Sequence, residues 1–258
     1  MLIVISPAKT LDFESEPVTK SYSQPQMLKD SEALMDVLST KSPSDIEKLM
    51  GISPALAELN VERYHKWSRP FRPSNAKQAI LAFRGDVYAG LEADKFKDEQ
   101  FDYAQDHLRI LSGLYGVLRP LDLIQPYRLE MGVKLKNPAG ENIYDFWDEK
   151  LTKKINKQLK AIDSKILLNL ASVEYFKSLK PKSIQAEIIS PVFKDWKNGQ
   201  YKMISFFAKK ARGTMSAWVI KNQVEDPEQL IKFRSDGYRY SARETKDPMK
   251  PVFIRKQT

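Results

Sequence analysis

The chain begins with five consecutive apolar residues, Met1 to Ile5, and continues directly into the polar loop Ser6-Pro7-Ala8-Lys9-Thr10. An apolar run that does not alternate with polar residues predicts a central strand buried on both faces. Such a strand requires packed layers on both sides of its sheet, which favours a sheet surrounded by helices. The loop that follows the strand is a favourable place for functional side chains.

Local signals mark several further elements. Ser42-Pro43 and Ser53-Pro54 each place a capping hydroxyl before a proline at the first helical position, and Gly51 ends the first of these two helices. The dipeptide Asn198-Gly199 predicts a tight hairpin turn. From the spacing of apolar residues we also expect helices at 98–111, 143–159 and 209–222, and strands at 78–83, 165–170, 185–193, 201–207 and 251–256, the last at a sheet edge.

No low-complexity linker, internal repeat or shift in composition divides the sequence, and 42% apolar residues supply an ordinary core. We therefore expect one compact α+β domain over residues 1–258, with a mixed β-sheet core surrounded by helices. No apolar run approaches the roughly 20 residues that span a bilayer, so no membrane partner is expected. The absence of cysteine excludes disulfides and thiolate metal sites and fits a cytoplasmic location.

Positive charge is concentrated in the later part of the chain. The net charge is +9, with 13 Lys and Arg against 15 Asp and Glu in residues 1–100, and 29 against 18 in residues 101–258. This asymmetry indicates an acidic partner such as nucleic acid, although many basic proteins bind none. Charge alone leaves both interpretations open.

The segment LRILSGLYGVLRP, residues 108–120, has the order of features of a helix-hairpin-helix element within about 101–125. An amphipathic helix would end at Gly113, Gly116 would follow, and a segment led by Pro120 would come next. In such an element the glycines allow backbone N–H groups to approach a phosphate, next to a helix N-terminus. Two residues separate these glycines where the usual hairpin has one, so an ordinary helix end followed by a turn is the alternative.

A second cationic element is the cluster of Lys209, Lys210 and Arg212, which we expect at a strand-to-helix junction. Three cations within four residues would anchor phosphates, and an arginine adds bidentate contacts. A solvated cluster is the alternative. Tyr115, Tyr127 and Arg128 are candidates for the same basic surface, whereas the lysines between 150 and 160 fit a solvated helix face.

Lys9 is a candidate nucleophile, because it follows a buried strand and is flanked by small residues. A lysine amine removed from water loses its charge more readily and can attack an abasic site in DNA. A phosphate-binding or merely exposed lysine is the alternative. The sequence leaves enzymatic activity uncertain and favours a protein that is not an enzyme.

Metal and cofactor sites have little support. No phosphate-binding GxxxxGK[ST] loop, GxGxxG motif or GxSxG motif occurs, so we expect no cofactor, including no nucleotide cofactor. The two histidines are far apart in the sequence and lack the spacing of a helical metal site, and no spacing singles out a carboxylate set for a hard cation. The residues considered are His65, His107, Asp86, Asp122, Glu130 and Glu174.

Five segments of the sequence carry a resemblance to a known family. They are MLIVISPAKTLDF (1–13), AILAFRGDVYAGL (79–91), HLRILSGLYGVLRPLDLIQPYRLEMG (107–132), NLAS with EYFKS (169–178) and FFAKKARG (206–213). Through these segments the chain resembles the YaaA peroxide-stress protein family over essentially its full length. Five blocks in the same order make coincidence implausible.

The resemblance implies a cytosolic bacterial protein induced by hydrogen peroxide, with a family-specific fold and a basic cleft. It also implies a helix-hairpin-helix element that binds duplex and branched DNA, and an association with low unincorporated iron. Transferred to this sequence, the hairpin comprises Ser112, Gly113, Leu114, Tyr115, Gly116 and Val117, with Arg119 beyond it.

Three hypotheses follow. The first is a protein that binds double-stranded or branched DNA through the hairpin and the cluster of Lys209, Lys210 and Arg212, and so protects it from oxidative damage. The second is an enzyme of the lyase or glycosylase type that acts on damaged DNA with Lys9 as its nucleophile. The third is an iron-binding or iron-regulating protein.

Overall fold

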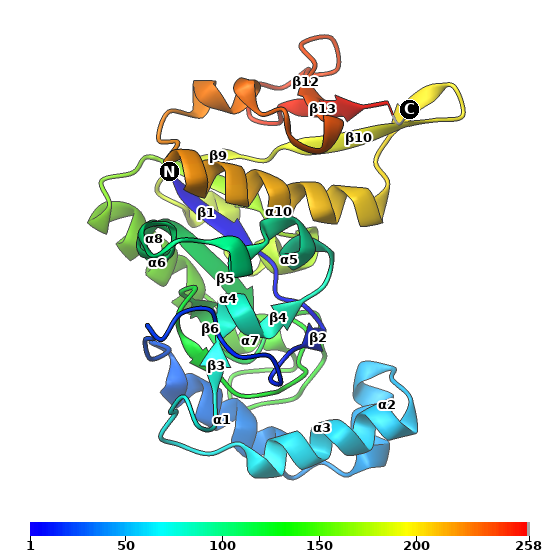
Figure 1. The fold of residues 1–258 in the computed structure, drawn as a ribbon. Coiled ribbons are helices and arrows are strands. Elements are labelled where there is room, and N and C mark those ends of the chain that lie inside the picture. Colours follow the sequence, from blue (N-terminus) through cyan, green and yellow to red (C-terminus); the bar gives the residue numbers. More distant parts are fainter. Residues whose placement is uncertain (257–258) are drawn as a thin grey trace.

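The protein is described by a computed structural model covering residues 1–256. Its central feature is a five-stranded mixed sheet in which β1 lies in the middle and pairs in parallel with β5 and β8, while β6 is antiparallel (Figure 1). In sheet order the strands are β6 (Gly116–Leu118), β5 (Leu108–Ser112), β1 (Leu2–Ile5), β8 (Ile166–Leu170) and β9 (Glu187–Ile189). All four residues of β1 are fully buried. The predicted α+β class and the predicted buried first strand are both confirmed.

A second sheet is formed by the C-terminal part of the chain. Its strands, in sheet order, are β11 (Gln200–Lys202), β10 (Val192–Lys197), β13 (Val252–Arg255) and β12 (Arg239–Tyr240). Asn198 and Gly199 adopt φ values of 51° and 80°, so the predicted hairpin turn is confirmed. Strand β13 pairs on both sides, so the predicted position of 251–256 at a sheet edge is wrong.

Helix α10 (Ser205–Asn222) packs against both sheets (Figure 1). The predicted strand at 201–207 is wrong beyond Lys202, because the helix starts at Ser205. Helix α5 (Asp86–Leu91) crosses α10 at very short range: a Cβ at Gly213 would lie 1.7 Å from the carbonyl oxygen of Val87. The two backbones therefore touch, and this contact fixes where the first turns of α10 lie.

Three helices, α1 (Leu28–Leu38), α2 (Pro43–Met50) and α3 (Pro54–Lys66), lie at the end of the molecule opposite the second sheet (Figure 1). Ser42 and Asp45 form a capping box at the start of α2, and Gly51 ends it with a φ of 61°. Both helices start at the predicted prolines and Gly51 ends the first, but the capping hydroxyl is confirmed only at Ser42, because the Ser53 side chain forms no capping hydrogen bond.

Short elements connect these layers. Residues 78–83, predicted as one strand, instead contain a helical turn, α4 (Ala79–Ala82), between two short strands. The short strands pair as β2 (Thr10–Leu11) with β4 (Phe83–Arg84), and as β3 (Lys77–Gln78) with β7 (Leu123–Ile124). Short 3-10 helices occupy Ala93–Lys95, Pro181–Ser183, Pro227–Lys232 and Ser235–Gly237.

The segment predicted as helix-hairpin-helix has a different structure. Helix α6 (Asp98–His107) ends at His107, and the chain continues as strand β5. Strand β5 turns at 112–116 and returns antiparallel as β6, so the element is a β-hairpin. The helical spacing of apolar residues extended to Leu111, but parallel pairing of β5 with the buried β1 overrides it.

The helix predicted at 143–159 is divided into α7 (Ile143–Trp147) and α8 (Lys150–Ala161). Asp148, between them, has a φ of 41°, which a continuous helix does not allow. Leu151, Ile155 and Leu159 still form one buried stripe, while Lys153, Lys157 and Lys160 are exposed, in agreement with a solvated face. Within residues 1–256 no helix combines the length and apolarity needed to cross a membrane.

Candidate functional site

A pocket of about 440 Å³ opens at the carboxyl ends of β1 and β8. The chain leaves β1 toward β5 on one side of the sheet and leaves β8 toward β9 on the other. Two adjacent parallel strands whose connections diverge in this way leave a crevice between their ends, which is where open α/β sheets bind ligands. The loops after these strands, 6–10 and 170–175, both contribute to the pocket wall.

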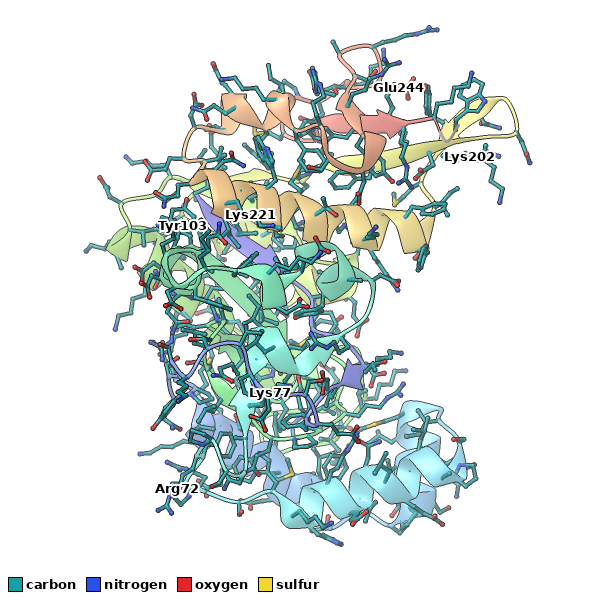
Figure 2. The ribbon with its side chains drawn as sticks, in the orientation of Figure 1. Arg72, Lys77, Tyr103, Lys202, Lys221 and Glu244 are labelled. Atoms are coloured by element: carbon teal, nitrogen blue, oxygen red, sulfur yellow. The ribbon has the colours of Figure 1, made fainter. Side chains whose placement is uncertain are left out.

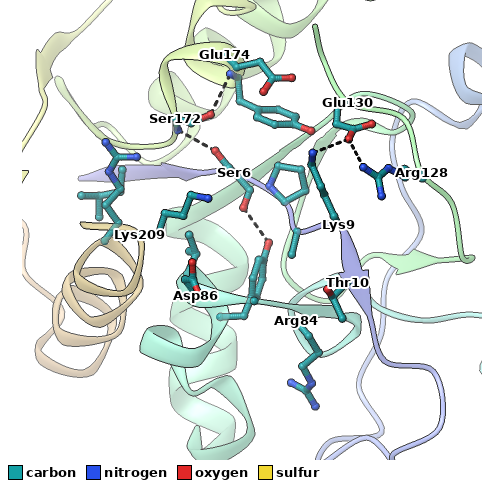
Figure 3. A pocket seen from close by; sticks show the side chains of 18 of the residues that line it. Ser6, Lys9, Thr10, Arg84, Asp86, Arg128, Glu130, Ser172, Glu174 and Lys209 are labelled. Carbon is teal, nitrogen blue, oxygen red and sulfur yellow. Dashed lines mark hydrogen bonds and ion pairs between the residues drawn. The ribbon is translucent and has the colours of Figure 1, made fainter. Parts of the chain in front are cut away.

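The pocket is lined by charged side chains of both signs and by three tyrosines (Figure 3). Its cations are Lys9, Arg84, Arg128, Lys209 and Arg212, its carboxylates are Asp86, Glu130 and Glu174, and its tyrosines are Tyr88, Tyr127 and Tyr175. These residues come from segments far apart in the sequence. Cations outnumber carboxylates, so the site favours an anionic ligand.

One wall is formed by α10. Lys209 and Arg212 stand three residues apart on the helix and both line the pocket. Neither side chain forms a hydrogen bond or an ion pair within residues 1–256. Arg212 is partly buried, and its desolvation lowers the pKa of the guanidinium below the usual value. Lys210 is not part of the pocket lining, and its ammonium lies 3.5 Å from Asp236.

The facing wall carries a compact ionic group. Nζ of Lys9 and Nη2 of Arg128 each lie 3.0 Å from Oε1 of Glu130 (Figure 3). Burial opposes ionisation of Glu130, but the hydrogen bond from Lys9 and the charge of Arg128 outweigh it and hold the pKa of the carboxyl below its usual value. The Lys9 side chain is 65% exposed. It is therefore a solvated, ion-paired lysine and not a desolvated amine.

The floor of the pocket is held by hydrogen bonds around Ser6. Oγ of Ser6 accepts a hydrogen bond of 2.8 Å from the backbone N–H of Ser172, which links the ends of β1 and β8. The hydroxyl of Tyr88 donates to the carbonyl oxygen of Ser6 at 3.1 Å (Figure 3). Burial raises the pKa of Tyr88 well above its usual value, so this hydroxyl remains a donor. The floor is therefore preformed.

The predicted phosphate-binding hairpin, residues 112–117, lies beneath the wall that contains Glu130 and does not line the pocket. Ser112, Gly113, Leu114, Tyr115, Gly116 and Val117 are all buried, and none lines the pocket. A Cβ at Gly113 would lie 2.2 Å from the carbonyl oxygen of Leu129, and Gly116 packs against Trp147. The glycines permit close packing inside the protein, so the predicted helix-hairpin-helix geometry is wrong.

Two further residues near the hairpin are also engaged within the protein. Arg119 donates from Nη2 and Nε to Oδ1 of Asp122, at 2.8 and 3.1 Å, and Asp122 is fully buried. The hydroxyl oxygens of Ser112 and Tyr127 lie 2.6 Å apart. Tyr127 lines the pocket, whereas Ser112 does not. Of the three residues assigned to a common basic surface, Tyr127 and Arg128 line the pocket and Tyr115 does not.

Asp86, Glu130 and Glu174 belong to the pocket lining, and Asp122 does not. Within residues 1–256 no group of three His, Asp or Glu side chains is placed to hold a metal ion. The two histidines are separate: His65 contacts the carbonyl oxygen of Ser39, and His107 stacks on Tyr103 and contacts the carbonyl oxygen of Met1.

The sequence indicates the loop after β1, which contains Ser6, as a place for functional side chains, but it does not indicate Ser172 or Arg84. Ser172 follows a strand predicted as buried, so the rule that ligands bind beyond strand ends would have indicated it. Arg84 offered no local signal. It reaches the site through the β2–β4 pairing, and its guanidinium lies 2.9 Å from Asp12.

Comparison with known proteins shows what the chain is similar to, both as a family and as a single relative. A family model described as peroxide stress protein YaaA matches residues 1–244. A protein of Teredinibacter turnerae described as a UPF0246 protein is 56% identical over 257 residues, which cover 100% of each chain.

Proposed function

This chain belongs to the family of the peroxide stress protein YaaA, and from that premise we propose that it acts in peroxide stress by binding double-stranded or branched DNA through its cationic pocket. Lys209 and Arg212 hold the phosphates, and Lys9 and Arg84 add positive charge at the same site. Binding of this kind depends on the backbone of DNA and little on its sequence. Bound protein then shields the DNA from oxidative damage.

The observation that supports this proposal most is the environment of Arg212. Its guanidinium is partly buried in the pocket wall and has no acidic partner in the part of the chain that the structure describes. Removing a cation from water without a counter-charge is costly, and arginine donors match the oxygens of a phosphate. A phosphate in the pocket supplies the missing partner.

The geometry favours the two alternatives less. An amine nucleophile requires a desolvated lysine, whereas Lys9 is exposed and paired with Glu130. For iron, no group of three potential ligands occurs within residues 1–256, so an effect of the protein on free iron is indirect in this proposal.

The test is the salt dependence of binding to a fluorescent DNA duplex. We expect Lys209→Ala with Arg212→Ala to lower the affinity at least about tenfold and to reduce the slope of log K against log salt by about 2, one for each phosphate contact. Lys210 is left unchanged in this variant because it lies outside the pocket, and changing it as well would mix the effect of pocket residues with that of a residue outside the pocket.

The matched control is Lys210→Ala with Lys157→Ala, which removes the same charge outside the pocket. Lys210 lies on the same helix and pairs with Asp236, and Lys157 is exposed on α8. We expect the control to retain most of the affinity. Equal losses in the two double variants would show that net charge acts without the pocket, and the proposal would be wrong.

A further inference from the structure

The pocket carries cations on two facing walls. Lys209 and Arg212 project from α10, and Lys9 comes from the loop between β1 and β2. Figure 3 shows Lys209 and Lys9 on opposite sides of Ser6. On the Lys9 wall two cations, Lys9 and Arg128, share the single carboxylate of Glu130, so a phosphate bound at α10 would leave this net positive charge without a ligand anion. The two walls together therefore suit a ligand that has negative charge at both ends.

Between these walls the pocket presents hydrogen-bond acceptors. Asp86 and Glu174 lie on opposite sides of Ser6 in Figure 3, across the direction that joins Lys209 to Lys9. Asp86 forms no hydrogen bond or ion pair within residues 1–256, and Glu174 accepts only one, from the N–H of Gly132 through Oε1. Carboxylates repel phosphate, but they accept hydrogen bonds from the amino groups of nucleobases. The middle of the pocket therefore suits an uncharged group that carries donors.

The pocket also has the size and surface for such a group. Its volume of about 440 Å³ lies within the range of roughly 300 to 1,000 Å³ found for small-molecule sites. Tyr88, Tyr127 and Tyr175 supply aromatic surface against which a base can pack. This volume admits a single nucleotide, whereas a double helix can contact the pocket only at its mouth.

A nucleotide within a DNA strand has this distribution of charge, because a phosphate lies on each side of its base. Building on the proposed function, we propose that the pocket holds one nucleotide turned out of the duplex. One flanking phosphate lies at Lys209 and Arg212, the other lies at Lys9, and the base lies between Asp86 and Glu174. The protein then recognises DNA at positions where a nucleotide is unpaired or easily unpaired.

The first experiment compares two duplexes of the same sequence, one fully paired and one with a single bulged nucleotide. Turning out a paired base costs free energy that a bulged base has already lost, so we expect the parent protein to bind the bulged duplex at least about tenfold more tightly. Lys9→Ala is expected to reduce this preference to about threefold or less. Lys210→Ala, on the same helix as Lys209 but outside the pocket, is expected to keep the preference.

The second experiment separates a nucleotide in a strand from a free nucleotide. By calorimetry, a deoxynucleoside 3′,5′-bisphosphate is expected to bind and to compete with bulged DNA, while the 5′-monophosphate binds at least about tenfold more weakly because it occupies one wall only. Lys9→Ala is expected to remove this difference.

The outcomes distinguish this inference from the proposed function. Equal affinity for paired and bulged DNA, with a normal loss in the Lys209→Ala/Arg212→Ala variant, overturns the turned-out nucleotide and leaves DNA binding at the pocket intact. Tight binding of the monophosphate without any DNA binding overturns both, and it would identify the pocket as a site for a free nucleotide.

Discussion

The β5–β6 hairpin and the first turns of α10 both carry sequence features typical of phosphate binding, yet the structure places them in opposite environments. Gly113 and Gly116 lie inside the protein, under Leu129 and Trp147. Lys209 and Arg212 line an open pocket and have no partner within residues 1–256. Both segments were candidates for the same function, so the difference between them shows which signal is informative.

The difference arises from what surrounds each signal. Around the glycines the chain is apolar, with Leu111, Leu114 and Val117 all buried, and there glycine allows two backbones to approach closely. Around the cations of α10 the buried residues are small: Ala208, Ala211 and Gly213. Small residues allow α10 to pack closely against α5, while the long cationic side chains extend to the pocket. Charge without a nearby counter-charge is therefore the more informative signal.

The largest effect is expected where the hairpin is packed most tightly. Gly113→Ala places a Cβ 2.2 Å from the carbonyl oxygen of Leu129, which is backbone and cannot rotate away, so we expect the free energy of unfolding to fall by about 3 kcal/mol. Urea denaturation measures it. Gly132→Ala is the control, since the nearest atom there is Oε1 of Glu174 at 3.3 Å, the end of a flexible side chain. Unchanged stability with lost DNA binding in Gly113→Ala would return the hairpin to the interface.

A smaller effect, of opposite sign, is expected in α10. Arg212→Met removes a partly buried cation that has no partner within the described residues, so we expect stability to stay the same or to rise by up to about 1 kcal/mol while DNA affinity falls. Arg109→Met in β5 is the comparison, because burial also lowers the pKa of Arg109, to about 10, but its Nη1 donates to the carbonyl oxygens of Gln105 and Leu108. We expect Arg109→Met to lose about 1 to 3 kcal/mol. Urea denaturation measures the free energy of unfolding of both variants. Comparable losses of stability would mean that Arg212, like Arg109, is held by partners within the protein.

The smallest expected effect is a change in stability with pH, and it arises from Glu130 in the pocket wall opposite α10. Because the pKa of Glu130 is held below its usual value of 4.5, its contribution to stability is complete above pH 4.5 and is lost as the pH falls toward the pKa of the folded state. The stability difference between the parent and Glu130→Gln should therefore shrink between pH 7 and pH 3.5, by about 1 kcal/mol or less, since Lys9 is mostly exposed. Denaturation at the two pH values measures it. A difference that does not change with pH would mean that Lys9 and Arg128 do not hold this carboxylate.

Local signals predicted local structure well. The capping box of Ser42 and Asp45 and the left-handed turn at Asn198-Gly199 are complete within a few residues, so the sequence contains all that determines them. The end of α6 at His107 is different, because Leu108 and Leu111 fit a helix or a strand equally well. Pairing with β1, more than 100 residues away in the sequence, makes the choice.

The pocket residues also divide into those that the local sequence indicates and those that depend on distant parts of the chain. Lys9, Lys209 and Arg212 could be singled out from charge and from their positions beside predicted elements, and they do converge on one site. Arg84 and Glu130 could not, because their place depends on how short strands and irregular segments cross the end of the sheet. Nothing in the sequence around Arg84 or Glu130 distinguishes them from other charged residues, and only the path of the folded chain brings their side chains to the pocket.

The central position of β1 also has a consequence for how the protein forms during synthesis. Ile3 pairs with Leu108 on one side and with Leu168 on the other, so β1 leaves the ribosome well before the two strands that flank it in the sheet. At about 5 to 20 residues per second, this delay lasts roughly 10 to 30 seconds. Until both neighbours are made, the apolar strand Leu2–Ile5, which is fully buried in the finished protein, has no complete sheet to enter, and it exposes the nascent chain to aggregation.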